Sequence, residues 1–436
     1  MDIEICVDKK DSGVINRNLK KTLQNISVQK NGHFGLSSKF DIEIRKEIIG
    51  SKIKIKGPFD DKEMFHKLLF DSILCLKKKG IGNPDYNDLL SELKNKINAY
   101  IRKPLRKFIV LLPLHSTGGA LIRKRWFNIQ GTRFYKSDWL KVHNISGWKS
   151  FKNRAKDIRY LTSNLEEQIL PMQQYFTPLI ANVDARSTSE AFQIANKKYE
   201  IIRSILNLNF TFGKVTFQFG PPIPLGEILP PIFYGLFDEK GSYISLYFNE
   251  ESYIYKTISL KNNDIEYLNR MIKRIDKMEE DIKSVFIDSL LKYVRALDTS
   301  DWRDAFLTLW QILENLSLSS LSSGITMRQI SSRVKNLMGP TDILHKELID
   351  SLVDTRNKLV HLGKFSKSGL MEVNFIKIIV DQALSNFYWL LKLFPSKVEL
   401  EEFFQIATKN ENELKRRKSI AMSAMKILQK SITSRH

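Results

Sequence analysis

The two halves of the chain differ in the spacing of their hydrophobic residues. Before about residue 260, short stretches in which apolar and polar residues alternate are mixed with stretches of helical, three-to-four-residue spacing. Alternating or continuously apolar stretches predict strands at 40–45, 52–56, 108–112, 121–129, 243–249 and 253–259, the first two forming a hairpin around Gly50. Helical spacing predicts helices at 61–79, 85–103 and 187–208, the last with Ser187 or Thr188 as its N-cap.

The remainder of the chain has helical spacing throughout. Apolar residues recur every three or four positions from Ile265 to Leu297, which predicts one long amphipathic helix. Further helices are expected at 303–322, 326–338, 341–361 and 370–394. We therefore predict an α+β N-terminal domain over 1–260, which a further boundary near 105 would subdivide, an all-α helical bundle over 261–408, and a basic C-terminal helix or tail over 409–436.

Length and composition limit the kind of protein this is. A chain of 436 residues is too long for one ordinary core, and no apolar run reaches the roughly 18 residues that a membrane span needs. The acidic, alternating N-terminus does not resemble a secretory signal, and the two cysteines, Cys6 and Cys75, offer neither a disulfide framework nor a metal site. We expect a cytoplasmic protein without a membrane segment, a metal or another cofactor.

The charge favours a polyanionic partner. The net charge is +21 and the pI is about 9.6, although a genome that encodes lysine-rich proteins in general would give the same values. Between residues 123 and 159, eleven Lys or Arg and seven aromatic residues accompany only two acids, a mixture that suits RNA because bases stack on rings while cations bind phosphates. The alternative is a sheet with an apolar inner face and a lysine-rich outer face. The candidate RNA-binding residues in this segment are Arg123, Lys124, Arg125, Trp126 and Arg133.

A short motif near the C-terminal end indicates a chemistry. Residues 356–361 read Arg-Asn-Lys-Leu-Val-His, at the end of a strongly apolar helical stretch and just before Gly363. An arginine that binds a phosphate and a histidine that transfers a proton are the minimum for cutting RNA without a metal. None of the other six histidines has an arginine five residues upstream, although the spacing alone would arise by chance in roughly one of three such chains.

Together with the segment 302–316, this motif resembles the Apea-like branch of the HEPN superfamily, found in bacterial anti-phage proteins, over roughly residues 285 to 395. The resemblance implies a HEPN-type bundle that forms a homodimer, with two motifs converging on one cleft. It implies a metal-independent endoribonuclease that cuts tRNA or mRNA in abortive infection, with the N-terminal domain sensing an unknown trigger. In that mechanism His361 moves protons, Arg356 stabilises charge on the phosphate, and Asn357 orients the phosphate or the imidazole.

Helix geometry adds an expectation about partners. Arg356 falls inside the apolar arc of the 341–361 helix, and a buried arginine needs a partner. Glu314, on the apolar edge of its own predicted helix, is the candidate, and His345 would lie close on the same helix as Arg356. His361 is about 140° away from Arg356 around a regular helix. Either the helix unwinds before His361 or the two residues act across a dimer. The nearby candidate RNA-binding residues are Lys358 and Lys364.

Two other functions are compatible with the same residues. The first is a non-catalytic, dimeric RNA-binding scaffold, which salt-sensitive RNA binding without cleavage would favour. The second is a HEPN toxin of a toxin–antitoxin pair, which a neighbouring nucleotidyltransferase gene would favour. A metal-dependent nuclease is not expected, since no carboxylate cluster has the spacing of metal ligands.

Overall fold

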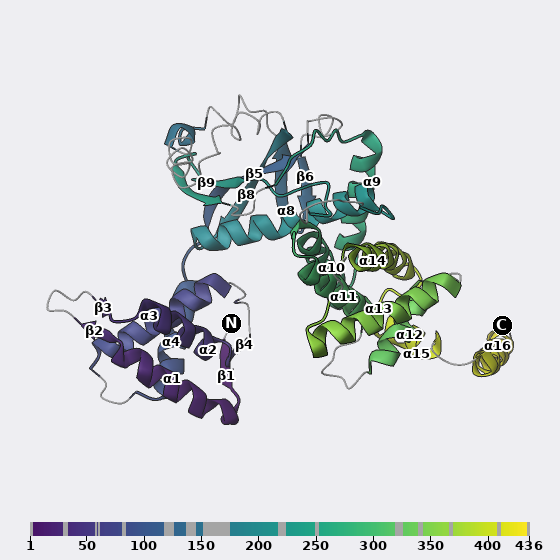
Figure 1. Cartoon of the computed structure of the whole chain (residues 1–436), viewed down its shortest axis with the longest axis horizontal. Helices are drawn as coiled ribbons and strands as arrows, with labels where there is room; N and C mark the ends of the chain where they lie inside the picture. The colour runs from purple at the N-terminus through teal and green to yellow at the C-terminus, as the bar shows by residue number, and fades with distance from the viewer. Residues whose placement is uncertain are drawn as a thin grey trace.

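A computed structural model describes residues 3–28, 34–56, 59, 62–80, 84–116, 126–136, 145–150, 175–216, 224–248, 253–318, 326–338, 343–365, 369–407 and 411–433. The chain is α+β in its first part and helical after it, as predicted. Figure 1 shows a mainly helical N-terminal part, a sheet with a long helix across it, and a group of helices. None of the helices in the described ranges is both long and apolar enough to cross a membrane.

The N-terminal part has its own hydrophobic core, formed by residues between Ile3 and Tyr100. Two small antiparallel strand pairs lie at its surface, β1–β4 and β2–β3. Its elements are β1 (Glu4–Val7), α1 (Ser12–Gln24), β2 (Ile26–Val28), β3 (Phe34–Leu36), α2 (Lys39–Gly50), β4 (Ile53–Lys56), α3 (Lys62–Lys78) and α4 (Tyr86–Ile101).

The strand predicted at 40–45 is wrong, because these residues belong to helix α2. The Ser38 side chain accepts a hydrogen bond from the backbone of Asp41 and caps the helix, and Asp41 forms an ion pair with Arg45 one turn later at 2.8 Å. Ile42 and Ile49, seven residues apart, are both buried on one helix face. The strand at 53–56 does form, but it pairs with β1 and not with a neighbouring hairpin strand.

The middle of the chain forms an antiparallel six-stranded sheet in the order β10-β9-β5-β8-β7-β6. The strands are β5 (Arg106–His115), β6 (Trp126–Ile129), β7 (Thr132–Lys136), β8 (Phe176–Ala185), β9 (Phe233–Asp238) and β10 (Tyr243–Phe248). Helix α8 (Thr188–Thr211) packs across one face, and the Ser187 side chain caps it by accepting from the backbone of Glu190. The opposite face has a smaller core that includes Leu111, Trp148 and Phe237.

The strand predicted at 253–259 does not form, although this segment packs closely against the sheet. Its polar groups bond to other parts of the chain: the carbonyl of Lys256 accepts from Nε2 of His115 at 2.8 Å, and the Tyr255 hydroxyl donates to the carbonyl of Pro230 at 2.9 Å. His115 is 1% exposed, and its Nδ1 accepts from the backbone of Leu229. Burial lowers the pKa of His115 from 6.5 to about 4, so the ring is neutral at physiological pH.

The C-terminal part consists of helices that share one core with the sheet, from Phe108 to Phe404. The long helix predicted over 265–297 is two helices, because the chain turns at Lys277–Glu279 with Met278 buried. The helices are α9 (Asn262–Asp276), α10 (Glu280–Asp298), α11 (Trp302–Leu316), α12 (Met327–Leu337), α13 (Ile343–Leu362), α14 (Leu370–Leu390), α15 (Lys397–Ala407) and α16 (Glu411–Thr433).

Buried charges join the sheet part to the helices. Lys377 and Asp381 of α14, 1% and 0% exposed, form an ion pair at 2.7 Å. Asp381 also accepts from the Tyr293 hydroxyl and from the backbone of Gly213, just beyond α8, while Lys377 donates to the carbonyl of Thr211. These bonds give each buried charge a partner. A buried ion without a partner would destabilise the fold strongly. They fix the C-terminal end of α8 against α14.

Candidate active site

Arg356 and Glu314 lie opposite each other on α13 and α11. The guanidinium of Arg356 is 3.9 Å from Oε1 of Glu314, and the two side chains are 14% and 12% exposed. The same carboxylate oxygen accepts a hydrogen bond from the indole nitrogen of Trp310, one turn earlier on α11, at 2.8 Å. Trp310 is 2% exposed, so the carboxylate is held by the core and presents its charge to Arg356. The partner expected for Arg356 from helix geometry is therefore the residue that faces it.

His361 lies on a different side of the same helix and is exposed. Helix α13 continues to Leu362, and the chain leaves it only at Gly363, which has a φ of +62° and donates its amide to the carbonyl of Leu359 at 3.0 Å. The helix does not unwind before His361, so that route to bringing the two residues together is excluded within this chain. Arg356 faces α11 while His361 faces solvent.

The surroundings of His361 are basic and partly apolar. Lys358 and Lys364 are both exposed, and Asn357, four residues before His361, is half-buried. Val360 and Leu362, the neighbours of His361 in the sequence, are 49% and 63% exposed although the same apolar arc is buried earlier in the helix. The end of α13 therefore presents a histidine and two cations beside apolar side chains that no element of the described chain covers.

The other candidate residues are placed only in part. His345 belongs to α13, but its side chain lies outside the described residues. Arg123, Lys124 and Arg125 also lie outside them, as does the side chain of Trp126, the first residue of β6. Arg133 is exposed on β7, opposite Asn182 of β8.

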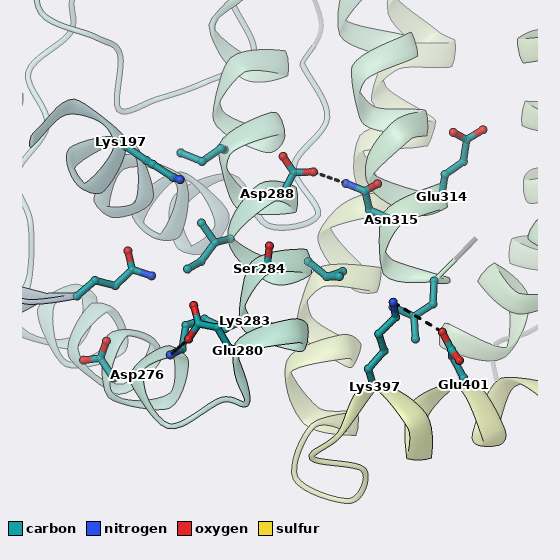
Figure 2. A pocket seen from close by; sticks show the side chains of 15 residues that line it. Lys197, Asp276, Glu280, Lys283, Ser284, Asp288, Glu314, Asn315, Lys397 and Glu401 are labelled. Carbon is teal, nitrogen blue, oxygen red and sulfur yellow. Dashed lines mark hydrogen bonds and ion pairs between the residues drawn. The ribbon is translucent and has the colours of Figure 1, made fainter. Parts of the chain in front are cut away.

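A cleft that the sequence did not indicate lies between the sheet part and the helices (Figure 2). Its volume is about 910 Å³, and Glu314 stands on α11 at its margin. Asn315, next to Glu314, donates to Asp288 of α10 at 2.6 Å inside the cleft. Other polar residues that line it are Lys197 of α8, Lys283 of α10, and Lys397 and Glu401 of α15. Because these elements are far apart in the sequence, only the folded chain brings the lining together.

The buried Lys377–Asp381 pair was also missed, although the sequence contains a signal for it. Asn374, Lys377 and Asp381 recur at helical spacing within an otherwise apolar stretch of α14. Such a polar stripe inside an apolar helix is expected only where each group has a partner. Among the described residues, no three His, Cys, Asp or Glu side chains gather in a way that could hold a metal ion. Comparison of the chain with protein-family models, curated proteins and solved structures found no match.

Proposed function

We propose that this protein is a metal-independent endoribonuclease of the HEPN type, acting in anti-phage defence. The observation that favours it most is the arrangement at the end of α13, where an exposed histidine between two exposed lysines follows an arginine that faces Glu314. A mostly buried, positively charged arginine suits the stabilisation of a phosphate, and an exposed imidazole suits proton transfer to a bound polymer.

In the proposed reaction the 2′-oxygen of the RNA forms a bond to the adjacent phosphorus, and the bond from phosphorus to the 5′-oxygen breaks. One proton leaves the 2′-hydroxyl and one is given to the departing 5′-oxygen, so no co-reactant is needed. His361 moves these protons, Arg356 stabilises the charge that develops on the phosphate oxygens, and Asn357 orients the phosphate or the ring. The products are a 2′,3′-cyclic phosphate and a 5′-hydroxyl.

A single chain does not bring Arg356 and His361 to one point, so the proposed active site is formed by two copies. The exposed Val360 and Leu362 beside His361 support this proposal, because apolar side chains at a helix end are typical of a surface that a partner covers. In a homodimer through this surface, two copies of α13 would approach each other at their C-terminal ends. The RNA would then contact His361, Lys358 and Lys364 from both copies.

The test is cleavage of total RNA and tRNA in EDTA by the wild type, Arg356→Ala and His361→Ala, with the product ends mapped. We expect cyclic phosphate ends from the wild type and a loss on the order of 10²–10³ in rate for each variant. Asp354→Ala is the control, since Asp354 is exposed on the same side of α13 two turns before His361. Undiminished cleavage by His361→Ala would refute the proposal. If the purified wild type is silent, growth arrest on expression, lost in both variants, would separate a silent enzyme from a scaffold.

A further inference from the structure

The outer face of helix α1 is a row of cations without a carboxylate. Arg17, Lys20 and Lys21 are exposed and share this face with Gly13 and Gln24, at positions three and four residues apart. Lys9 and Lys10, both exposed, precede the helix at the same end as Gly13. In Figure 1, α1 lies along the edge of the N-terminal part that is farthest from the sheet. We call Lys9, Lys10, Arg17, Lys20 and Lys21 the α1 basic face.

The acids that lie near this face already have other partners. Asp8 forms an ion pair with Lys54 at 3.1 Å, and Asp11 forms one with Lys52 at 3.3 Å. Asp41 is bonded to Arg45, which lowers the pKa of its carboxyl group, and the charge of Lys21 lowers it further. Within the described chain, none of the five cations of the α1 basic face has a carboxylate within ion-pair distance. Lys21 and Asp41 attract each other only beyond ion-pair distance, so the cations of this face are not neutralised by contact with a described carboxylate.

We propose that the α1 basic face binds the phosphodiester backbone of RNA. A helix row of cations about 5–6 Å apart can follow a strand of phosphates and neutralise several of them at once. The substrate class rests on the proposed ribonuclease function, but the binding surface is separate from α13. The N-terminal part would thus hold RNA while the end of α13 cuts it.

The same face does not suit the other polyanionic or protein partners. A helix that lies on a membrane buries an apolar face in the lipid, whereas the apolar residues of α1, including Ile15, Leu19 and Leu23, are buried in the protein core. Protein interfaces depend on central aromatic or apolar anchors, and the α1 basic face has none. Phosphate groups spaced along a flexible polymer are the ligand that requires cations alone.

The test measures binding of a short labelled single-stranded RNA to the full-length His361→Ala protein across a salt titration. In this background the RNA stays intact whether or not the wild type cleaves. The test variant adds Arg17→Glu, Lys20→Glu and Lys21→Glu. Loss of three phosphate contacts should reduce the salt slope by about 2 and the affinity by roughly 100-fold at about 0.1 M salt.

The matched control adds Arg270→Glu, Lys273→Glu and Lys277→Glu, which are exposed along and just after α9 beside the acids Glu266 and Asp276. It changes the net charge by the same amount but leaves the α1 basic face intact, so the proposal predicts a far smaller loss of affinity from it. Equal losses in both variants would show that affinity follows net charge and would overturn the assignment. Unchanged RNA binding by the α1 variant would also overturn the assignment. This holds even if the variant loses binding to anionic vesicles. A protein that binds RNA through α1 but never cleaves it would refute the ribonuclease proposal alone.

Discussion

Removing Asp381 should destabilise the core that the sheet shares with the C-terminal helices. Asp381 is 0% exposed and accepts three hydrogen bonds, from Tyr293, from the backbone of Gly213 and from the ammonium group of Lys377. In Asp381→Leu the ammonium group, itself 1% exposed, keeps only the carbonyl of Thr211 as a partner. The change therefore leaves a buried charge without a counter-ion.

The structure suggests the size of this effect. Breaking a buried ion pair from one side costs about 3–5 kcal/mol of unfolding free energy, and full burial of both groups places this pair in that range. Lys377→Met should cost less, about 2–3 kcal/mol, because Tyr293 and Gly213 still donate to the carboxylate. The double variant should cost less than the sum of the two by about 2 kcal/mol, since neither charge then remains unpaired.

Tryptophan fluorescence in urea can measure this without interference from the N-terminal part, because all six tryptophans lie at residue 126 or beyond. The variants can be compared if the urea concentration at the midpoint shifts while the dependence of the unfolding free energy on urea concentration stays constant. Two results would refute the view that Lys377 and Asp381 stabilise the fold as a coupled pair. One is that the free-energy changes of the two single variants add strictly in the double variant, and the other is a cost of Asp381→Leu below about 1 kcal/mol.

Three further predictions concern other sites. The pKa of His115 is about 4 in the folded protein and 6.5 in the unfolded chain, so the unfolded chain takes up a proton first as the pH falls. About 3 kcal/mol of unfolding free energy should therefore be present above pH 6.5 and be lost as the pH falls towards 4. His115→Gln should abolish this part of the pH dependence, which urea unfolding measures. Gly147→Ala should destabilise by about 1–3 kcal/mol in thermal melts, since its new carbon would lie 2.1 Å from the backbone nitrogen of Tyr243, whereas Gly13→Ala, which meets nothing within 4 Å, should not. Glu314→Gln keeps the acceptor for Trp310 but removes the charge that faces Arg356. On the proposed function, the rate of RNA cleavage should fall about tenfold or more, which corresponds to ~1.4 kcal/mol of activation free energy. Unchanged cleavage would count against a positioning role for Glu314.

Amphipathic geometry explains which parts of the structure were predictable. The position of Arg356 inside an apolar arc required a partner on a neighbouring helix, and Glu314 sits on the matching edge of α11. The α8 helix and its Ser187 cap were predictable for the same reason, because a helix of 24 residues repeats its pattern many times. The catalytic roles of Arg356, Asn357 and His361 stay predictions.

The errors occur where a pattern was short or where the partners are distant. Five alternating residues at 40–44 fit either a strand or a helix, and the cap at Ser38 and the buried Ile42 and Ile49 decided for the helix. The segment 253–259 has the composition of a strand, but its Lys256 carbonyl bonds to His115, 141 residues earlier. The turn at Met278 and the cleft beside Glu314 likewise depend on packing between distant elements, which spacing along the chain does not encode.

Helix α8 contacts the N-terminal part at one end and α14 at the other. At its N-terminal end, the Tyr100 hydroxyl bonds to Ser187 and Glu190, so the N-terminal part is attached to the first turn. At the other end, Gly213 is bonded to Asp381 of α14, the helix that follows the Gly363 turn after α13. Its 24 residues form a strut about 36 Å long that is packed along the sheet and resists bending. A ligand that moved the N-terminal part would therefore also move α14, because both are bonded to the same helix.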